Sequence, residues 1–218
     1  MRIVSHTGGL AWTNCFLVID DGTKKAVLFD APDHTVGPLL DQVEHDGLDL
    51  IGLWLTHGHF DHLADHQVVR DRFPNVRILI HKLDEPKLLT PGSRMFPLPF
   101  TIPPGKADGY LEGGQQLSIG TLALTVMETP GHAPGHVSFY FKDEGILIGG
   151  DLIIGGSVGR TDLPDSNPAD LDASIRRVMA LPPETQLLGG HGEATTLGHE
   201  AKNNAYIRRL LTHPQTRS

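Results

Sequence analysis

Residues 57–62 read HGHFDH, and they follow the short apolar segment 50–56 (LIGLWLT), which is typical of a buried strand. Four side chains that can bind a metal therefore fall within six residues. If the chain is extended after the strand, His57 and His59 point to the same side, because side chains alternate along an extended segment. Asp61 and His62 would then lie in the first turn of a helix and could face a second metal. The motif predicts a metal site at the end of a strand.

Three further candidate ligands occupy the same kind of position later in the chain. His132 follows the apolar segment 122–127 through Thr-Pro-Gly, Asp151 follows ILIGG (146–150), and His191 follows LLGG (187–190). Functional residues gather in loops at strand ends. Taken alone, each of the three could be an ordinary structural residue, but the shared context favours a common site. Imidazole and carboxylate suit zinc, and they also suit iron and manganese. We predict a site formed by His57, His59, Asp61, His62, His132, Asp151 and His191.

Two other histidines lie four residues after a predicted ligand. His66 follows His62 at the spacing of a helical zinc pair, but His62 already faces the site with its neighbour, so we expect His66 to face away. His136 follows His132, but a Pro-Gly pair lies between them, so we expect His136 at most to support a ligand. The remaining histidines are expected to be structural or on the surface: His6, His34, His45, His81, His199 and His213.

Composition narrows the class of protein. The 218 residues, 39% hydrophobic and 20% charged, are enough for one sizeable domain over residues 1–218. The net charge of −8 argues against nucleic-acid binding, which depends on clustered Lys and Arg. Cys15 is the only cysteine, which excludes an intrachain disulfide and a thiolate metal cage. The sequence has no apolar segment typical of a signal peptide or a membrane helix, so we expect a cytoplasmic protein without a membrane partner. It leaves the oligomeric state open.

The order of the expected elements predicts an α/β fold. In the first half, strands are expected at 14–20, 25–30, 50–56 and 76–81, and helices at 36–45 and from the HGHFDH motif to about residue 72. In the second half, strands are expected at 116–119, 122–127, 137–141, 145–148 and 185–188, and helices at 171–181 and 200–211. Helices end each half, which suggests two packed sheets covered by helices.

The proline-rich segment 89–106 interrupts this pattern. Its prolines exclude a regular helix or a central strand. Apolar side chains lie between the prolines, at Phe96, Leu98, Phe100 and Ile102. We expect an ordered loop, anchored by these side chains, that covers a pocket.

The seven candidate ligands, in their order and context over about residues 12–195, resemble the pattern of the metallo-β-lactamase superfamily. The resemblance implies an αβ/βα four-layer sandwich. It also implies one metal bound by His57, His59 and His132, and a second bound by Asp61, His62 and His191. Asp151 would then bridge the two divalent ions, for which zinc is favoured and iron or manganese are alternatives.

Within that superfamily, residues 155–162 (GGSVGRTD) and 190–198 (GHGEATTLG) are similar to short glyoxalase II-like hydrolases. Those proteins hydrolyse thioesters such as S-lactoylglutathione. The resemblance implies a small-molecule thioester substrate, which could be linked to glutathione. The C-terminal helical domain of full-length glyoxalase II is expected to be missing, because the matching region reaches almost to the end of the chain.

The predicted chemistry is metal-assisted hydrolysis, with Asp61 and Asp151 as the catalytic carboxylates. Two metals that share a water lower its pKa to about 7, and the resulting hydroxide attacks the thioester carbonyl. A thiol with a pKa of roughly 8.5 leaves without a strong general acid.

Several alternatives use the same fold or the same ligands. One is a persulfide dioxygenase with a single Fe(II) held by His59, His132 and Asp151, which the GRTD motif at 159–162 also resembles. Another is a lactone or β-lactam hydrolase. A third is a metal-binding module without catalytic activity.

Overall fold

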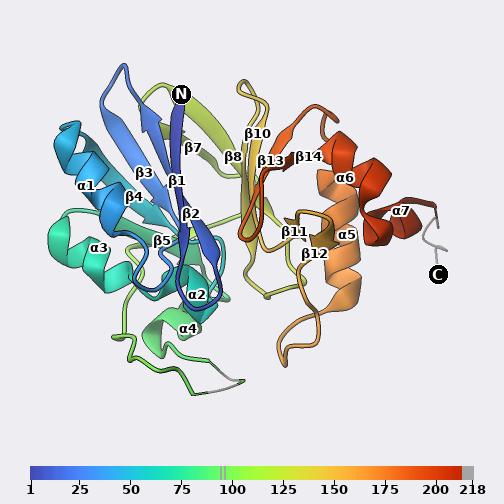
Figure 1. Ribbon diagram of the computed structural model, residues 1–218, viewed down its shortest axis with the longest axis horizontal. Coiled ribbons are helices and arrows are strands. Elements are labelled where there is room, and N and C mark those ends of the chain that lie inside the picture. The colour runs from blue at the N-terminus through green and yellow to red at the C-terminus, as the bar shows by residue number, and fades with distance from the viewer. Residues whose placement is uncertain (94, 96, 213–218) are drawn as a thin grey trace.

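The computed structural model describes residues 1–93, 95 and 97–212. Two six-stranded sheets pack face to face, and helices lie on the outer face of each (Figure 1). The first sheet has the order β1-β2-β3-β4-β5-β6, formed by Arg2–Gly8, Thr13–Asp20, Lys25–Phe29, Asp49–Trp54, Arg77–His81 and Gly109–Leu111. The second has the order β14-β13-β10-β9-β8-β7, formed by Thr195–Thr196, Gln186–Gly189, Ile146–Gly150, Val137–Phe141, Leu122–Glu128 and Gln116–Ile119. The predicted αβ/βα four-layer sandwich is confirmed.

The helices and a short ribbon complete the layers. On the side of the first sheet are α1 (Gly37–His45), α2 (Phe60–Leu63), α3 (His66–Arg72) and α4 (Glu85–Leu89). On the side of the second are α5 (Pro168–Val178), α6 (Leu197–Asn203) and α7 (Ala205–Thr212). A two-stranded ribbon, β11 (Ile153–Ile154) and β12 (Ser157–Val158), follows β10. No helix among the described residues is long and apolar enough to span a bilayer.

The strand β2 shows why the sheets form the middle of the molecule. All eight of its residues are buried. Leu17 and Ile19 belong to the core beneath the helices, whereas Phe16 and Val18 belong to the core between the two sheets. Side chains alternate between the faces of a strand, so a strand that is apolar on both faces must be covered on both faces.

The ends of strands from both sheets meet along one edge of the sandwich. In the first sheet, β3 and β4 are parallel, and Asp30 and Thr56 follow them. In the second sheet, β10 and β13 are parallel, and Asp151 and His191 follow them. The backbone N–H of Asn14 in β2 donates to the carbonyl of Gly190 at 2.7 Å, which joins the two sheets at this edge.

The structure divides two of the predicted helices, and it contains further elements that were not predicted, which are α4, β1, β6, β11, β12 and β14. The expected helix at about 60–72 is divided into α2 and α3, and the expected helix at 200–211 is divided at Asn204 into α6 and α7. The strand β1 was not predicted. It lies at the edge of its sheet, and its burial pattern has no inward-outward alternation that would mark it as a strand.

Three of the predicted anchors in the proline-rich segment pack against the molecule, as expected. Ile102 is buried, and Leu98 and Phe100 pack against the core beneath the helices. Residues 90–93 and Met95 line a cavity beside the predicted site. Phe96, the fourth predicted anchor, lies outside the described residues, as does His213.

Candidate metal centre

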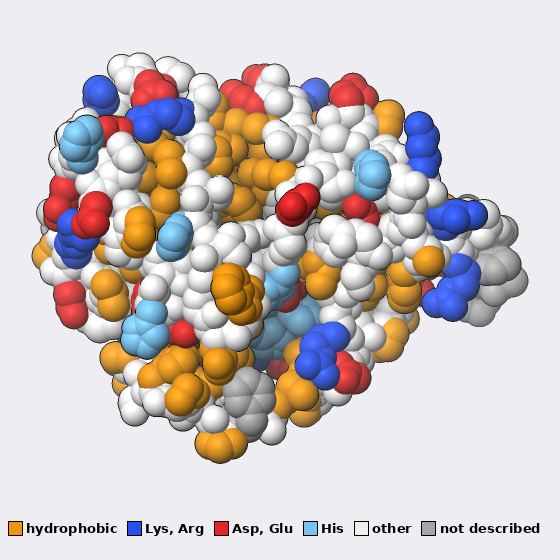
Figure 2. Space-filling model, in the orientation of Figure 1, with side chains coloured by type: hydrophobic (Ala, Val, Ile, Leu, Met, Phe, Trp, Pro, Cys, Tyr) orange, Lys and Arg blue, Asp and Glu red, His pale blue; other side chains and the backbone are white. Residues whose placement is uncertain are grey.

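The structure brings all seven predicted ligands together at the edge where the strand ends meet. Histidine side chains are visible in a recess between the two halves of the molecule in Figure 2. Donor atoms within 4.8 Å of one another form three overlapping groups. These groups are His57, His59 and His132; His57, His62 and Asp151; and Asp61, His62 and His191.

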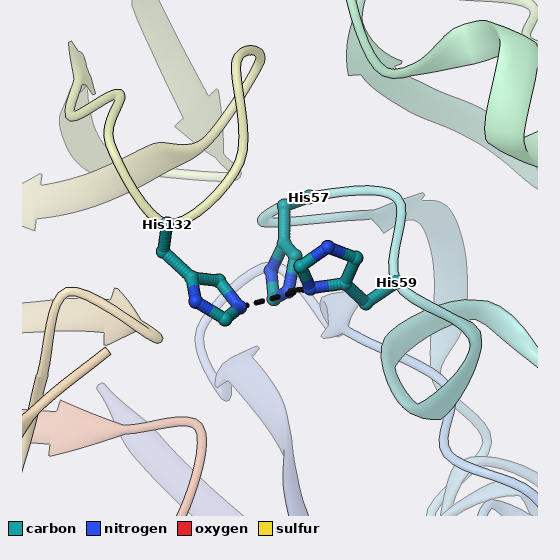
Figure 3. A group of neighbouring side chains, drawn as sticks. All are labelled: His57, His59 and His132. Atoms are coloured by element: carbon teal, nitrogen blue, oxygen red, sulfur yellow. Dashed lines mark hydrogen bonds between the residues drawn. The ribbon is translucent and has the colours of Figure 1, made fainter. Parts of the chain in front are cut away.

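The first group joins two loops from different sheets. His57 and His59 follow β4, whereas His132 follows β8. Nδ1 of His59 lies 3.0 Å from Nε2 of His57 and 2.8 Å from Nε2 of His132, so three imidazole nitrogens converge (Figure 3).

The set of Asp61, His62 and His191, called the second group below, is assembled around carboxylates. Nε2 of His62 lies 3.5 Å from Asp61 Oδ2 and 3.4 Å from Asp151 Oδ1. Nε2 of His191 lies 3.5 Å from Asp61 Oδ2 and 3.4 Å from Asp151 Oδ2. Because Asp151 Oδ2 is also 3.4 Å from Nε2 of His132, this carboxylate lies between the two groups.

Hydrogen bonds on the far side of the rings orient four of the five histidines. Nδ1 of His62 lies 2.8 Å from Asp30 Oδ2. Nδ1 of His132 lies 2.9 Å from a backbone carbonyl oxygen, and Nδ1 of His191 lies 3.3 Å from another. Nδ1 of His57 lies 3.0 Å from Thr56 Oγ1. A neutral imidazole carries one N–H. When Nδ1 donates that hydrogen, Nε2 has no proton and directs its lone pair into the site. This is how metal-ligating histidines are held by their neighbours.

Asp30 is a functional residue that the sequence reasoning missed. Its buried carboxylate accepts hydrogen bonds from the backbone N–H and the hydroxyl of Thr56, at 2.8 and 2.9 Å, and contacts His62. It therefore fixes the orientation of His57, through Thr56, as well as that of His62. The signal was available, since Asp30 directly follows the apolar segment of β3, as Asp151 follows β10.

His136 does not belong to the three groups, but it supports Asp151, as the sequence had suggested. Its Nε2 accepts a hydrogen bond of 2.9 Å from the backbone N–H of Asp151. The neutral ring must then donate from Nδ1 to Thr129 Oγ1, which is 2.8 Å away. His66 is buried and contacts the carbonyl of Leu63, so it faces away from the site as predicted.

In the absence of metal, the pKa values of the histidines are shifted in opposite directions in the two groups. Burial lowers the pKa of His57 well below its usual value and that of His59 to about 3, which keeps both rings neutral at pH 7. Burial also lowers the pKa of His62, but the carboxylates of Asp151, Asp61 and Asp30 outweigh it, so the net pKa lies well above the usual value. The second group is thus rich in negative charge, which favours a cation.

A cavity of about 570 Å³ opens beside these residues. His59, Asp61, His132, Asp151 and His191 lie in its wall. Apolar side chains and two cations also line the cavity, including Phe60, Lys87, Pro91, Met95, Arg160 and Leu163. A small molecule in this cavity would therefore contact both groups.

The comparisons with known sequences agree with this arrangement. The sequence pattern of the metallo-beta-lactamase superfamily matches residues 9–191. The probable metallo-hydrolase YqgX of Bacillus subtilis (strain 168) is 33% identical over 197 residues, which cover 88% of this chain and 90% of the relative. The hydroxyacylglutathione hydrolase GloC of Haemophilus influenzae is 29% identical over 209 residues, which cover 89% of this chain and 92% of the relative.

Solved structures show the same fold. The BLEG-1 B3 metallo-beta-lactamase superposes with a TM-score of 0.87 at 34% identity, covering 94% of this chain and 99% of that one. TTHA1623, solved in a di-iron-bound form, superposes with a TM-score of 0.81 at 36% identity, covering 93% of this chain and 99% of that one. The chain therefore belongs to the metallo-beta-lactamase superfamily, a group of metal-dependent hydrolases.

Proposed function

We propose that this protein is a thioesterase of the glyoxalase II type with two divalent metal ions. The first ion is held by His57, His59 and His132, and the second by Asp61, His62 and His191. Asp151, which lies between these two sets of donors, would be a ligand as well. The observation that carries the proposal is the convergence of these donor atoms from both sheets on one point beside a cavity.

The donor atoms fit metal ligation. Ligand atoms about 2.0–2.1 Å from a tetrahedral ion lie roughly 3.3 Å from one another. Neighbouring donors here are 2.8–3.5 Å apart. In addition, Nε2 of His62 and Oδ1 of Asp151 are buried and have no hydrogen-bond partner among the described residues. Such buried groups are costly unless something binds them, and a cation would satisfy both.

The chemistry follows from how the protein holds these groups. Two divalent ions, when bound, activate a water and stabilise the negative charge that develops on a carbonyl oxygen. Thr13 Oγ1 donates to Asp61 Oδ2 at 2.9 Å and so orients that carboxylate. Asp61 and Asp151 both lie in the cavity wall, where they can accept a proton from water. Phe60 also lines this cavity.

The thioester assignment is supported by two similarities. Segments 155–162 and 190–198 are similar to short glyoxalase II-like hydrolases, and a relative with 29% identity is a hydroxyacylglutathione hydrolase. A thiolate is also a suitable leaving group for a site whose cations, Lys87 and Arg160, are already paired with carboxylates. Zinc suits the donor set, and the di-iron form of a relative with 36% identity supports iron as the alternative.

The test is to measure metal content and substrate range on the same preparation. We expect about two divalent ions per chain by elemental analysis. We also expect hydrolysis of S-lactoylglutathione or another thioester in a panel that includes a coenzyme A thioester, a lactone and a β-lactam. His59→Ala should lose metal and activity, whereas His199→Ala, which changes an exposed histidine on α6, should lose neither. Full metal content and activity in His59→Ala would refute the site.

The persulfide dioxygenase alternative rests on three of the same residues. Nε2 of His132 lies close to both Nδ1 of His59 and Oδ2 of Asp151, which gives two histidines and one carboxylate for a single iron. It leaves the second group of donors without a role. One iron per chain, with oxygen consumed on addition of glutathione persulfide and no thioesterase activity, would favour this alternative.

A further inference from the structure

Asp84 lies beneath the metal-binding loops, just before α4, and its side chain is completely buried. Oδ2 of Asp84 accepts a hydrogen bond of 2.7 Å from the backbone N–H of Gly58. Oδ1 accepts one of 3.1 Å from the backbone N–H of Gly135. One carboxylate therefore binds two loops that are far apart in the sequence and come from different sheets.

These two loops carry the first group of donors. Gly58 stands between His57 and His59, and Gly135 is in the same loop as His132. The loops are also joined where their strands begin and end, since the N–H of Val137 donates to the carbonyl of Thr56 at 2.8 Å. Asp84 adds a second connection between the two loops, through Gly58 and Gly135.

The close packing around Asp84 explains why both positions are glycine. A Cβ atom on Gly58 would lie 2.9 Å from the carbonyl oxygen of Asp84 and 2.9 Å from Cβ of Lys87. A Cβ atom on Gly135 would lie 2.9 Å from the backbone nitrogen of Asp84. Neither glycine has a positive φ, so each is needed for space and not for its backbone conformation. Both loops are thus packed directly on the turn that carries Asp84.

Lys87 stabilises the buried carboxylate of Asp84. Its Nζ lies 3.2 Å from Oδ1 of Asp84 and 2.8 Å from Oδ2 of Asp165, across the cavity. A buried carboxylate without a partner would be strongly unfavourable, whereas one with two N–H donors and an ammonium group is satisfied. The carboxylate of Asp84 therefore holds the two loops together.

We propose that Asp84 is a positioning residue for the first metal subsite: it sets the separation of the loop of His57 and His59 from the loop of His132. This inference rests on the proposed metal binding. Nδ1 of His59 lies 3.0 Å from Nε2 of His57 and 2.8 Å from Nε2 of His132, so a small displacement of one loop would spoil the ligand geometry.

The test compares two buried carboxylates. Asp84→Asn replaces one acceptor oxygen by a donor and should break one of the two loop contacts. We expect the affinity for one of the two zinc ions to fall about 10- to 100-fold in a chelator competition, the range found for residues that support metal ligands. The metal-free variant should retain its far-UV circular dichroism.

Asp20→Asn is the matched control. Asp20 is also buried, and it accepts hydrogen bonds from Gly22, Thr23 and Thr121, joining the turns of the two sheets. It lies at the far end of β2 from Thr13, about 23 Å away at roughly 3.3 Å per residue. We expect this variant to lower the melting temperature of the metal-free protein without changing the zinc affinity.

The outcomes separate this inference from the proposed function. If wild-type protein binds no metal, the proposed function is wrong and the inference fails with it. If wild-type protein binds two ions and Asp84→Asn binds both equally well, only the inference is wrong. If Asp84→Asn does not fold, Gly135→Ala provides the test, because it keeps the carboxylate and displaces one loop. The same loss of affinity is then expected, and unchanged affinity would overturn the inference.

Discussion

At the scale of single residues, the hydrogen bond made by one nitrogen of an imidazole determines that the other nitrogen faces the site. His62 presents Nε2 to the site because its Nδ1 lies 2.8 Å from a carboxylate oxygen of Asp30. His132 does so because its Nδ1 donates to the carbonyl of Arg160. His59 presents Nδ1 instead. The motif spacing predicted the ligands, but it could not predict which ring nitrogen faces the site. The hydrogen-bond partners that decide this are about 30 residues away in the sequence.

Asp30→Asn tests this orienting role. Only the oxygen of the amide can accept hydrogen bonds, so asparagine cannot replace both carboxylate oxygens that face Thr56 and His62. The ring of His62 should then lose its fixed tautomer. We expect about a 10- to 100-fold loss of metal affinity, measured by chelator competition. Asp33→Asn is the control, since Asp33 is also buried and its carboxylate accepts from the N–H of Leu10 and from no donor of the metal site among the described residues. Equal affinities in the two variants would contradict the role of Asp30.

At the scale of elements, the sequence predicted which strands lead into the site but not how each helix begins. The apolar segments before His57, Asp151 and His191 are all strands. The helix expected to run from the motif to residue 72 is interrupted because Asp65 has other partners. Its carboxylate accepts from the backbone N–H groups of residues 34–36, and its own N–H donates to the carbonyl of Ala31. Such contacts between distant segments leave no periodic signal in the sequence.

The start of α5 gives a prediction at this scale. The side chain of Asn167 accepts hydrogen bonds from the N–H groups of Ala169 and Asp170, so the helix begins at Pro168, before the expected residue 171. Asn167→Ala should lower the free energy of unfolding by about 1 kcal/mol, the usual cost of a lost N-cap. Denaturant unfolding measures this loss. The metal content should not change, because the backbone N–H of Asn167 still donates to Gly131. A loss of metal would mean that the cap also holds the loop of His132.

At the scale of the whole molecule, the site exists only because two sheets are packed together. Asp30, Asp61 and the loop of His57 belong to the first sheet and its helices, whereas His132 and Asp151 follow strands of the second. The sequence predicted two halves with helices outside, because strands lead into helices in each half. It could not predict which strands pair or which face meets which, since these depend on contacts between residues more than 100 positions apart, such as Asp20 with Thr121. The spacing within HGHFDH divided its four ligands between two metals, whereas the assignment of His132, Asp151 and His191 came from the family resemblance.

Metal removal should therefore make the stability of the whole molecule sensitive to acid. Metal at 1,000 times its Kd stabilises a fold by about 4 kcal/mol, and a chelator removes this contribution. In the metal-free protein, burial lowers the pKa of His136 to about 3, below the value of about 6.5 in an unfolded chain. Between these values the unfolded chain binds a proton that the folded protein does not, so stability is lost as the pH falls below 6.5.

This loss should be up to about 1.4 kcal/mol per pH unit for His136 alone. His59, whose pKa is also lowered to about 3 by burial, adds to it. His62 and His191 do not, because their pKa values are raised and both rings are protonated in the folded and unfolded states below pH 6. Melting temperatures of chelated protein between pH 6 and pH 5 measure the slope, because above about pH 6.5 the raised pKa values of His62 and His191 act in the opposite direction. His136→Gln should reduce it, because glutamine does not titrate, and an unchanged slope would show that His136 does not control the acid stability.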